Sequence, residues 1–278
     1  MKYISWDAAR SIEDNFLASL LKLVKIFSTI SNKSATVEEY EEKMKKFQRS
    51  TAYNNYINSI VKRMVLPVSK INASTWRKAA RKATKSYILY RLLKQNINNG
   101  LEASIQSQIN RNATIISTLP LSVSEKVVED VRKATFEGLR ATEISKIIRE
   151  KTVQHARASA KLIARTEVSK TQTALTRARA ENVEKLWYVW RTEEDARVRD
   201  SHKTMDDVLI KWQDPPSPEL LTGLPPAKNN VYYHAGEIYN CRCYPEVLLD
   251  INDVKWPHKV YLNGSIKFMS KKDFKEIF

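Results

Sequence analysis

Glycine and cysteine are both scarce in this chain of 278 residues. Its 5 glycines leave few positions suited to the positive-φ turns that a hairpin-rich β fold requires. Its 2 cysteines, Cys241 and Cys243, are separated by a single residue and exclude the disulfide framework of a small secreted protein. We therefore expect long helices and a fold that does not depend on disulfide bonds.

Long hydrophobic runs are absent as well. The most apolar stretch, residues 16–27, is interrupted by Lys22 and Lys25 and is shorter than the roughly 20 apolar residues of a membrane span. Glu13 and Asp14 precede it and no small-residue cleavage site follows, which is unlike a secretory signal peptide. We expect a soluble protein that is made in the cytoplasm and has no membrane among its partners.

Acidic residues are absent from residues 51–100, which hold 10 Lys and Arg residues and supply much of the net charge of +16. Such a block favours a polyanionic partner, and we expect non-specific binding to the phosphates of double-stranded DNA. A solvated helix face is the alternative. We expect the aromatic residues Trp76, Tyr87 and Tyr90 to belong to the core rather than to stack on nucleotides. The basic residues expected to contact phosphates are Arg77, Lys78, Arg81, Lys82 and Lys85.

Apolar residues recur every three or four positions through the first two thirds of the chain, which indicates amphipathic helices. Thr36 and Glu39 form a Thr-x-x-Glu capping box, and Ser74 can cap a further helix. Pro67 and Pro120 are expected to interrupt the helical pattern. We place the helices at about residues 5–30, 36–66, 74–98, 122–136, 142–148 and 152–184.

The character of the sequence changes near residue 186. The segment Leu-Trp-Tyr-Val-Trp-Arg at 186–191 is aromatic and β-branched, as strands are. Of the 9 prolines, 7 lie between residues 215 and 257, where short strands and loops are expected. The fold class is therefore α+β and predominantly helical. We divide it into a basic helical region at 1–150, a mixed α+β module at 151–255 and a Lys-rich C-terminal tail at 256–278.

Two thiols lie on what we expect to be one strand. Side chains at i and i+2 share a face, so Cys241 and Cys243 could bind one ion, and His202 and His234 could complete a tetrahedral zinc site. The spacing differs from that of standard zinc fingers. Two small buried side chains or a strained disulfide are the alternatives. Zinc is the one cofactor that the sequence suggests.

Charged residues gather near the start of the same module. A carboxylate at position 167 falls on the Ala-rich side of the long helix, where it requires a partner. Arginines downstream could pair with it through two parallel hydrogen bonds. We expect a structural ion network, with acid–base catalysis or phosphate binding as the alternatives. Its members are Arg165, Glu167, Asp195, Arg197 and Arg199.

Several motifs occur in a set order between about residues 140 and 245. The order is Thr142–Ile148, Ile163–Glu167, an aromatic strand to Trp190, Asp195-x-Arg-Val-Arg-x-x-His202, His234-Ala-Gly-Glu and Asn240-Cys-Arg-Cys. This ordered set resembles the phage Mu F-like head morphogenesis family, the minor head proteins of tailed phages. After the histidine, that family commonly has Leu-Asp-Gly. Here the sequence is Met205-Asp206-Asp207, so we expect a tight glycine turn to be lost.

The resemblance implies a minor capsid protein of the virion that acts in head morphogenesis, either in the capsid interior or at the portal vertex. Its implied partners are the portal protein, packaged double-stranded DNA and other capsid components, and it implies that the protein is sometimes ejected with the DNA. A purely structural portal adaptor is one alternative. The phosphate-binding, zinc-protease, serine-hydrolase and dinucleotide-binding motifs are missing, so we assign no catalytic residue. The enzymatic alternative is a zinc-dependent nuclease or toxin-like hydrolase that uses the His and Cys-x-Cys residues, with Glu167 as general acid and base.

Overall fold

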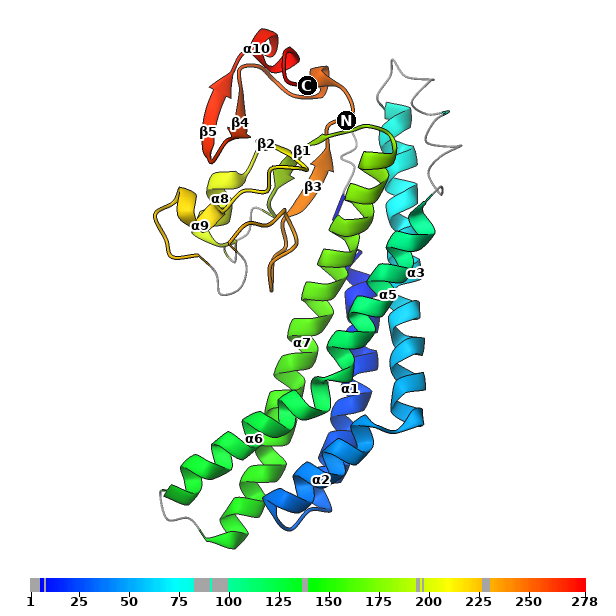
Figure 1. Ribbon diagram of the computed structural model, residues 1–278, viewed down its shortest axis with the longest axis vertical. Helices are drawn as coiled ribbons and strands as arrows, with labels where there is room; N and C mark the ends of the chain where they lie inside the picture. The colour runs from blue at the N-terminus through cyan, green and yellow to red at the C-terminus, as the bar shows by residue number, and fades with distance from the viewer. Residues whose placement is uncertain are drawn as a thin grey trace. The chain divides into compact units, whose positions relative to one another are not determined.

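The structure is a computed structural model that describes residues 6–7, 9–82, 91, 100–136, 140–193, 196, 198–226 and 231–278. Long helices come first in the chain and a five-stranded sheet with short helices follows (Figure 1). The predicted α+β, predominantly helical class is confirmed. The long helices are α1 (Arg10–Asn32), α2 (Val37–Gln48), α3 (Thr51–Lys82), α5 (Leu101–Ser117), α6 (Leu119–Phe136) and α7 (Ala141–Asn182).

The single helix predicted at 36–66 is wrong. The structure has two helices there, α2 and α3, and α3 continues beyond residue 66 to Lys82. The chain breaks after α2, where the Ser50 hydroxyl accepts a hydrogen bond from the Tyr53 N–H at 3.2 Å and so caps α3. Pro67 lies inside α3 and does not end it. Proline removes one helical hydrogen bond, but Val65 and Val68 on either side of it are fully buried, and this packing continues the helix.

The interruption predicted at Pro120 is confirmed, because α5 ends at Ser117 and α6 begins at Leu119, whereas the one predicted between residues 148 and 152 is absent. Pro120 lies in the first turn of α6, where its missing N–H is one that the helix would not use. Residues 142–148 and 152–184, expected as two helices, form the single helix α7. The segment between them contains no Gly or Pro that would end a helix.

The chain folds into two compact units, and neither is continuous in sequence. One unit comprises residues 10–66 and 107–165, and the other comprises residues 1–9, 67–106 and 166–278. Helices α3 and α7 each contribute residues to both units. Our division had placed its first boundary at residue 150, which lies within α7, because periodicity along the chain does not show which helices pack together.

The first of these units is a helical bundle with an apolar core. Its helices bury Leu20, Leu23 and Phe27 from α1 and Tyr40 and Met44 from α2. Polar groups inside it are paired across distant parts of the chain. The Tyr53 hydroxyl donates to the Ile116 carbonyl at 2.6 Å, and the Thr152 hydroxyl lies 3.0 Å from the hydroxyl of Tyr40.

The second unit contains a mixed sheet with strand order β3-β1-β2-β4-β5. Strand β2 pairs with β4 in parallel, and the other neighbours pair antiparallel. The predicted aromatic strand is confirmed as β1. Residues 256–278, expected as a tail, instead supply β4, β5 and α10, since alternating apolar residues there pair with the sheet edge. The elements are β1 (Trp187–Arg191), α8 (Asp200–Met205), β2 (Val208–Lys211), α9 (Pro218–Leu221), β3 (Tyr244–Val247), η1 (Ile251–Asp253), β4 (His258–Leu262), β5 (Ser265–Met269) and α10 (Lys271–Lys275).

Both faces of this sheet are buried at strand β1. Tyr188 and Trp190 of β1 belong to the larger cluster, which also contains Trp76 of α3. Trp187 and Val189 point to the opposite face, where they pack in a smaller cluster with Phe274 of α10. Because side chains alternate along β1, Tyr188 and Trp190 lie on the face of the sheet where Cys241 and Cys243 are buried. Among the described residues, no helix is long and apolar enough to cross a membrane.

Candidate functional site

Two short segments meet beside the buried face of β1. Helix α8 carries His202, whose ring is 2% exposed and lies edge-on to the Trp190 ring at 5.6 Å. The second segment, residues 234–243, is named the Cys loop here and leads into β3. The Cys loop is irregular and contains Cys241 and Cys243, which are both buried and are free thiols. The predicted strand through the two cysteines is therefore wrong, because β3 begins only at residue 244.

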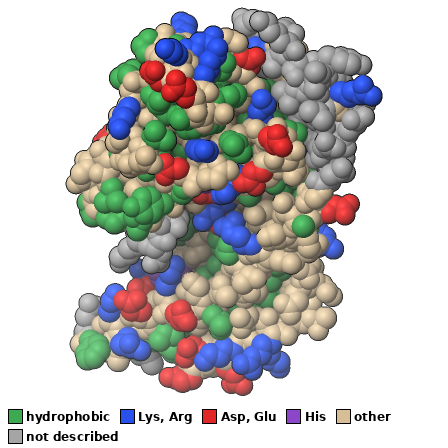
Figure 2. All heavy atoms as spheres, turned by 45° about the horizontal axis from the view of Figure 1, so that its top comes forward, with side chains coloured by type: hydrophobic (Ala, Val, Ile, Leu, Met, Phe, Trp, Pro, Cys, Tyr) green, Lys and Arg blue, Asp and Glu red, His purple; other side chains and the backbone are tan. Residues whose placement is uncertain are grey.

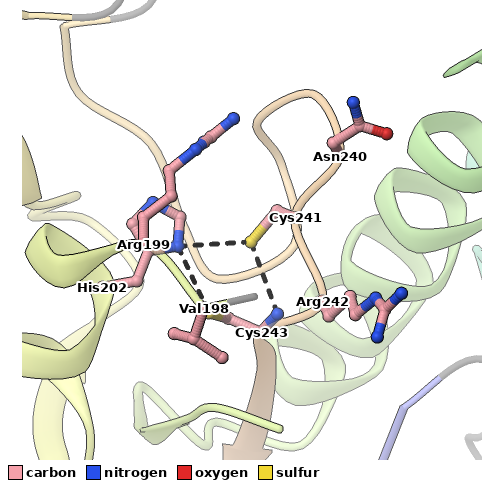
Figure 3. Close-up of a pocket in the computed structure, with 7 residues that line it drawn as sticks. All are labelled: Val198, Arg199, His202, Asn240, Cys241, Arg242 and Cys243. Atoms are coloured by element: carbon pink, nitrogen blue, oxygen red, sulfur yellow. Dashed lines mark hydrogen bonds between the residues drawn. The ribbon is translucent and has the colours of Figure 1, made fainter. Parts of the chain in front are cut away.

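The imidazole of His202 lies beside both thiols. Its Nδ1 atom is 3.3 Å from the Cys243 sulfur and 3.5 Å from the Cys241 sulfur. The three potential ligand atoms all lie within 4.8 Å of one another. Figure 3 shows the Cys241 sulfur directed toward the His202 ring, while the Asn240 and Arg242 side chains point away from it. Three of the four residues predicted as metal ligands are thus brought together.

The far side of the His202 ring faces a second pair of polar residues. Its Nε2 atom is 3.0 Å from the Tyr233 hydroxyl, which in turn lies 2.8 and 2.7 Å from the two carboxylate oxygens of Glu219. Tyr233 and Glu219 are 2% and 7% exposed. These five side chains therefore form one buried chain of hydrogen bonds from a carboxylate through a phenol and an imidazole to two sulfurs.

The two thiols differ strongly in acidity. A hydrogen bond from the Cys243 thiol holds the pKa of Cys241 well below the usual value for cysteine. The same hydrogen bond, together with burial, raises the pKa of Cys243. The pair therefore favours the state in which Cys243 keeps its proton and Cys241 is a thiolate that accepts a hydrogen bond from it.

His234, the fourth residue predicted as a metal ligand, does not join the other three in the described part of the chain. Its Nδ1 atom lies 3.1 Å from the Tyr188 hydroxyl, and its ring packs edge-on against Trp212 at 5.2 Å. His234 is 2% exposed and packs against Tyr188 and Trp212, which belong to the larger core cluster of the unit that contains the sheet. Because the Cys loop is irregular, the spacing of seven residues between His234 and Cys241 does not predict which way the His234 side chain points.

The buried position of His234 predicts a pH effect on stability. Burial lowers the pKa of His234 below the ordinary histidine value of about 6.5, so the folded protein favours the neutral ring. As the pH falls through about 6.5, the unfolded chain binds a proton there that the folded chain does not, and stability is lost. The variant His234→Gln should lose less stability than the wild type between pH 7.5 and pH 5. Urea unfolding at both pH values measures this, and an equal loss in the two proteins would contradict it.

Two members of the predicted ion network contact other groups. Arg165 forms an ion pair with Glu13 at 3.2 Å. Arg199 donates to the Tyr239 carbonyl at 2.9 Å and lies over the Tyr239 ring at 4.7 Å. Glu167 is buried, as predicted, at 5% exposure. The other two predicted members, Asp195 and Arg197, lie outside the described residues.

Helix α7 is joined to the Cys loop by short polar contacts. The Asn240 N–H donates to the Thr166 hydroxyl at 3.1 Å, and the Thr173 hydroxyl donates to the Ala235 carbonyl at 2.7 Å. Between them, Gly236 has a φ of +85° and lies so close to α7 that a Cβ atom there would be 2.6 Å from the Thr173 hydroxyl. The loop therefore depends on glycine at this position.

The turn after α8 keeps its shape without glycine. Asp207 occupies the position where the resembled family has Gly, and it adopts a φ of +60°. Its N–H donates to the Trp190 carbonyl at 3.0 Å, and its carboxylate accepts from Arg191 at 2.7 Å. The predicted loss of the turn is therefore wrong, because Asp tolerates the left-handed region and is held there by these bonds.

A small cavity of about 120 Å³ lies beside the two cysteines. Val198 and Arg199 line it on the α8 side, and residues 240–243 line it on the loop side. His202 and both sulfur-bearing side chains border it, so a group bound to them would face this cavity (Figure 3).

The predicted DNA-contacting residues lie on the outer side of α3. Arg77, Lys78, Arg81 and Lys82 are exposed, while Trp76 is fully buried against Trp6, as expected for a core residue. Lys85, Tyr87 and Tyr90 lie outside the described residues. On the face shown in Figure 2, Lys and Arg side chains form several separate groups with acidic side chains between them.

Comparisons with known proteins agree with the ordered motifs. Residues 125–245 match a family model described as Phage Mu protein F like protein. An uncharacterized protein of Haemophilus influenzae is 30% identical over 144 residues, which cover 51% of this chain and 29% of that relative. The chain thus spans less than a third of the length of the curated relative it matches. No solved structure matches it. The predicted resemblance is confirmed: residues 125–245 match the phage Mu protein F-like family, which relates the chain to phage head proteins.

Proposed function

We propose that this chain is a minor head protein of a tailed phage, built into the virion in the capsid interior or at the portal vertex. The observation that carries this proposal is the family match over residues 125–245. That range holds α7 and the Cys loop, which contact each other at Thr166, Thr173 and Gly236. The proposed partners are the portal protein, packaged double-stranded DNA and other capsid components.

Non-specific DNA binding is the part of this function that we assign to α3. Its outer side carries four exposed basic residues within six positions, at i, i+1, i+4 and i+5, which share one helix face. Trp76, Ala79 and Ala80 anchor the opposite side of the same turns in the core, so the row is held rigidly. Such a row contacts phosphates and reads no base sequence. The residues are Arg77, Lys78, Arg81 and Lys82.

A salt titration with matched variants tests the DNA interface. We expect the wild type to bind duplexes of unrelated sequence equally, with an affinity that falls by a slope of about 0.9 per contacted phosphate on a log–log plot. The variant with Arg77, Lys78, Arg81 and Lys82 all changed to Gln should lose about three to four units of that slope. The control changes four exposed basic residues of the helical bundle to Gln, which removes the same charge: Lys126, Arg132, Arg157 and Lys161. Equal losses in both variants, or no salt slope in the wild type, would overturn the interface.

Portal association has its own test. The chain and the portal protein of the same phage, expressed together with only one of them tagged, should elute as one complex at a salt concentration that abolishes DNA binding. Recovery of the chain with DNA but never with portal would contradict the portal part of the proposal and leave the DNA part standing.

The second candidate function is a zinc-dependent nuclease or toxin-like hydrolase. It is favoured by one observation, that the His202, Cys241 and Cys243 cluster borders a cavity that also contains the Arg199 side chain. Incubation of the zinc-loaded protein with single- and double-stranded DNA and RNA tests it. Cleavage that disappears in Cys241→Ser would favour this function over the structural one.

A further inference from the structure

The His202, Cys241 and Cys243 cluster has the geometry of a metal site. We infer that it binds one zinc ion through His202 Nδ1 and the two sulfur atoms, and that the ion fastens the Cys loop to α8. This inference goes beyond the proposed head function and does not depend on it. It rests on the arrangement of side chains within the unit that contains the sheet.

The distances between the ligand atoms fit a tetrahedral ion. Zinc binds sulfur at about 2.3 Å and imidazole nitrogen at about 2.0–2.1 Å, so a tetrahedral ion separates the nitrogen from each sulfur by about 3.5–3.6 Å. The observed separations from Nδ1 of His202 are 3.3 Å to Cys243 and 3.5 Å to Cys241. Both nitrogen–sulfur separations therefore agree with a tetrahedral ion within a few tenths of an ångström, and the two sulfurs lie within 4.8 Å of each other.

The hydrogen bonds behind His202 leave the correct nitrogen free to bind. The Glu219 carboxylate only accepts, so the single hydroxyl proton of Tyr233 is donated to Glu219. Tyr233 must then accept from His202, which places the ring proton on Nε2. In the neutral ring, Nδ1 consequently presents a lone pair, and it presents it to two sulfur atoms. Ligating histidines in metal sites are held in this way by a second hydrogen-bonded group.

The donor set selects the metal. Two thiolates and one imidazole suit zinc, whereas calcium and magnesium require oxygen ligands. Within the described residues the cluster offers three protein ligands, and the cavity of about 120 Å³ beside it has room for a water molecule at the fourth position. The Cys loop has no regular secondary structure of its own between Tyr233 and Tyr244, so a bound ion would add a fixed point near its C-terminal end.

The first experiment measures metal content in the intact chain. Protein purified without chelators, or stripped and then supplied with zinc chloride, should hold one zinc per chain by elemental analysis after exhaustive buffer exchange. With cobalt(II) in place of zinc, an intense sulfur-to-cobalt charge-transfer band should appear. Less than about a tenth of an equivalent of zinc after reconstitution, or a cobalt spectrum without that band, would overturn the inference. Because both results come from the wild type, they do not depend on how a variant folds.

Variants then identify the ligands. Cys241→Ser, Cys243→Ser and His202→Gln should each lose stoichiometric zinc. The matched control is His234→Gln, which alters a histidine that is as deeply buried, at 2% exposure, in the same Cys loop. It should keep one zinc per chain. Retention of zinc by the double variant Cys241→Ser/Cys243→Ser would show that the ion binds elsewhere.

Tyr233 is assigned as a positioning residue. Tyr233→Phe keeps the ring and removes the acceptor for the Nε2 proton, so zinc affinity should fall about 10- to 100-fold in competition with a chromophoric chelator. The cobalt charge-transfer band should remain, because both sulfurs still bind. An unchanged affinity would contradict the role of Tyr233 while leaving the three ligands in place.

Discussion

Replacing Gly236 with alanine is expected to lower the free energy of unfolding by about 2–5 kcal/mol. Two costs combine at this position. A left-handed φ of +85° disfavours any residue with a Cβ atom by about 1–2 kcal/mol, and the new atom would lie 2.6 Å from the Thr173 hydroxyl and 2.8 Å from the Ser169 hydroxyl. It would also lie 3.0 Å from the Cys243 carbonyl, which is backbone and cannot rotate away.

Gly264 provides the matched control for this prediction. It has a similar φ of +79°, but nothing lies within 4 Å of a Cβ atom placed there. Gly264→Ala should therefore show the backbone cost alone, about 1–2 kcal/mol. Urea unfolding of both variants measures the difference. Equal losses at the two positions would show that the Cys loop does not approach α7 as closely as described here.

Replacing Asn72 with alanine is expected to cost about 3 kcal/mol or more, because it removes the partner of a buried charge. Arg179 of α7 is 1% exposed. Its guanidinium donates to the Asn72 side-chain oxygen and, at 3.1 Å, to the Ser69 carbonyl. Burial lowers the pKa of Arg179 to about 10, so the ion remains protonated near neutral pH and requires its acceptors.

Two further variants separate the charge effect from ordinary packing. Thr176→Val removes a neutral hydrogen bond of 2.7 Å to the same Asn72 side chain and should cost only about 1 kcal/mol. In an Arg179→Met background, Asn72→Ala should cost far less than in the wild type, since no ion is left without an acceptor. Strict additivity of Asn72→Ala and Arg179→Met would contradict this account of the buried arginine.

The regular elements follow from local properties of the sequence. Apolar spacing located most helices, and the aromatic segment at 186–191 gave β1. Pro120 correctly marked the break between α5 and α6, whereas Pro67 misled the prediction, because the effect of a proline depends on its place in a helix and on the packing around it. The pairing of β2 with β4 joins residues about fifty positions apart, and periodicity carries no information on such pairings. For this reason the last strands were taken for a tail.

The candidate site was predictable in its chemistry and less so in its membership. The Cys-x-Cys pair and His202 were identifiable as thiol and imidazole ligands, and the structure brings them within 4.8 Å. His234 was grouped with them by sequence proximity, whereas the loop backbone directs it to Tyr188. Tyr233 and Glu219 went unnoticed because they are 14 positions apart and only the tertiary fold brings them together behind His202.

The central claim is that this chain is a component of a phage head, and quantitative mass spectrometry of purified virions tests it most directly. Particles of the phage that encodes the chain should contain it at a constant low copy number, well below that of the major capsid protein, after banding in a density gradient. A lysate that contains the protein, alongside infectious purified particles that lack it, would contradict the claim.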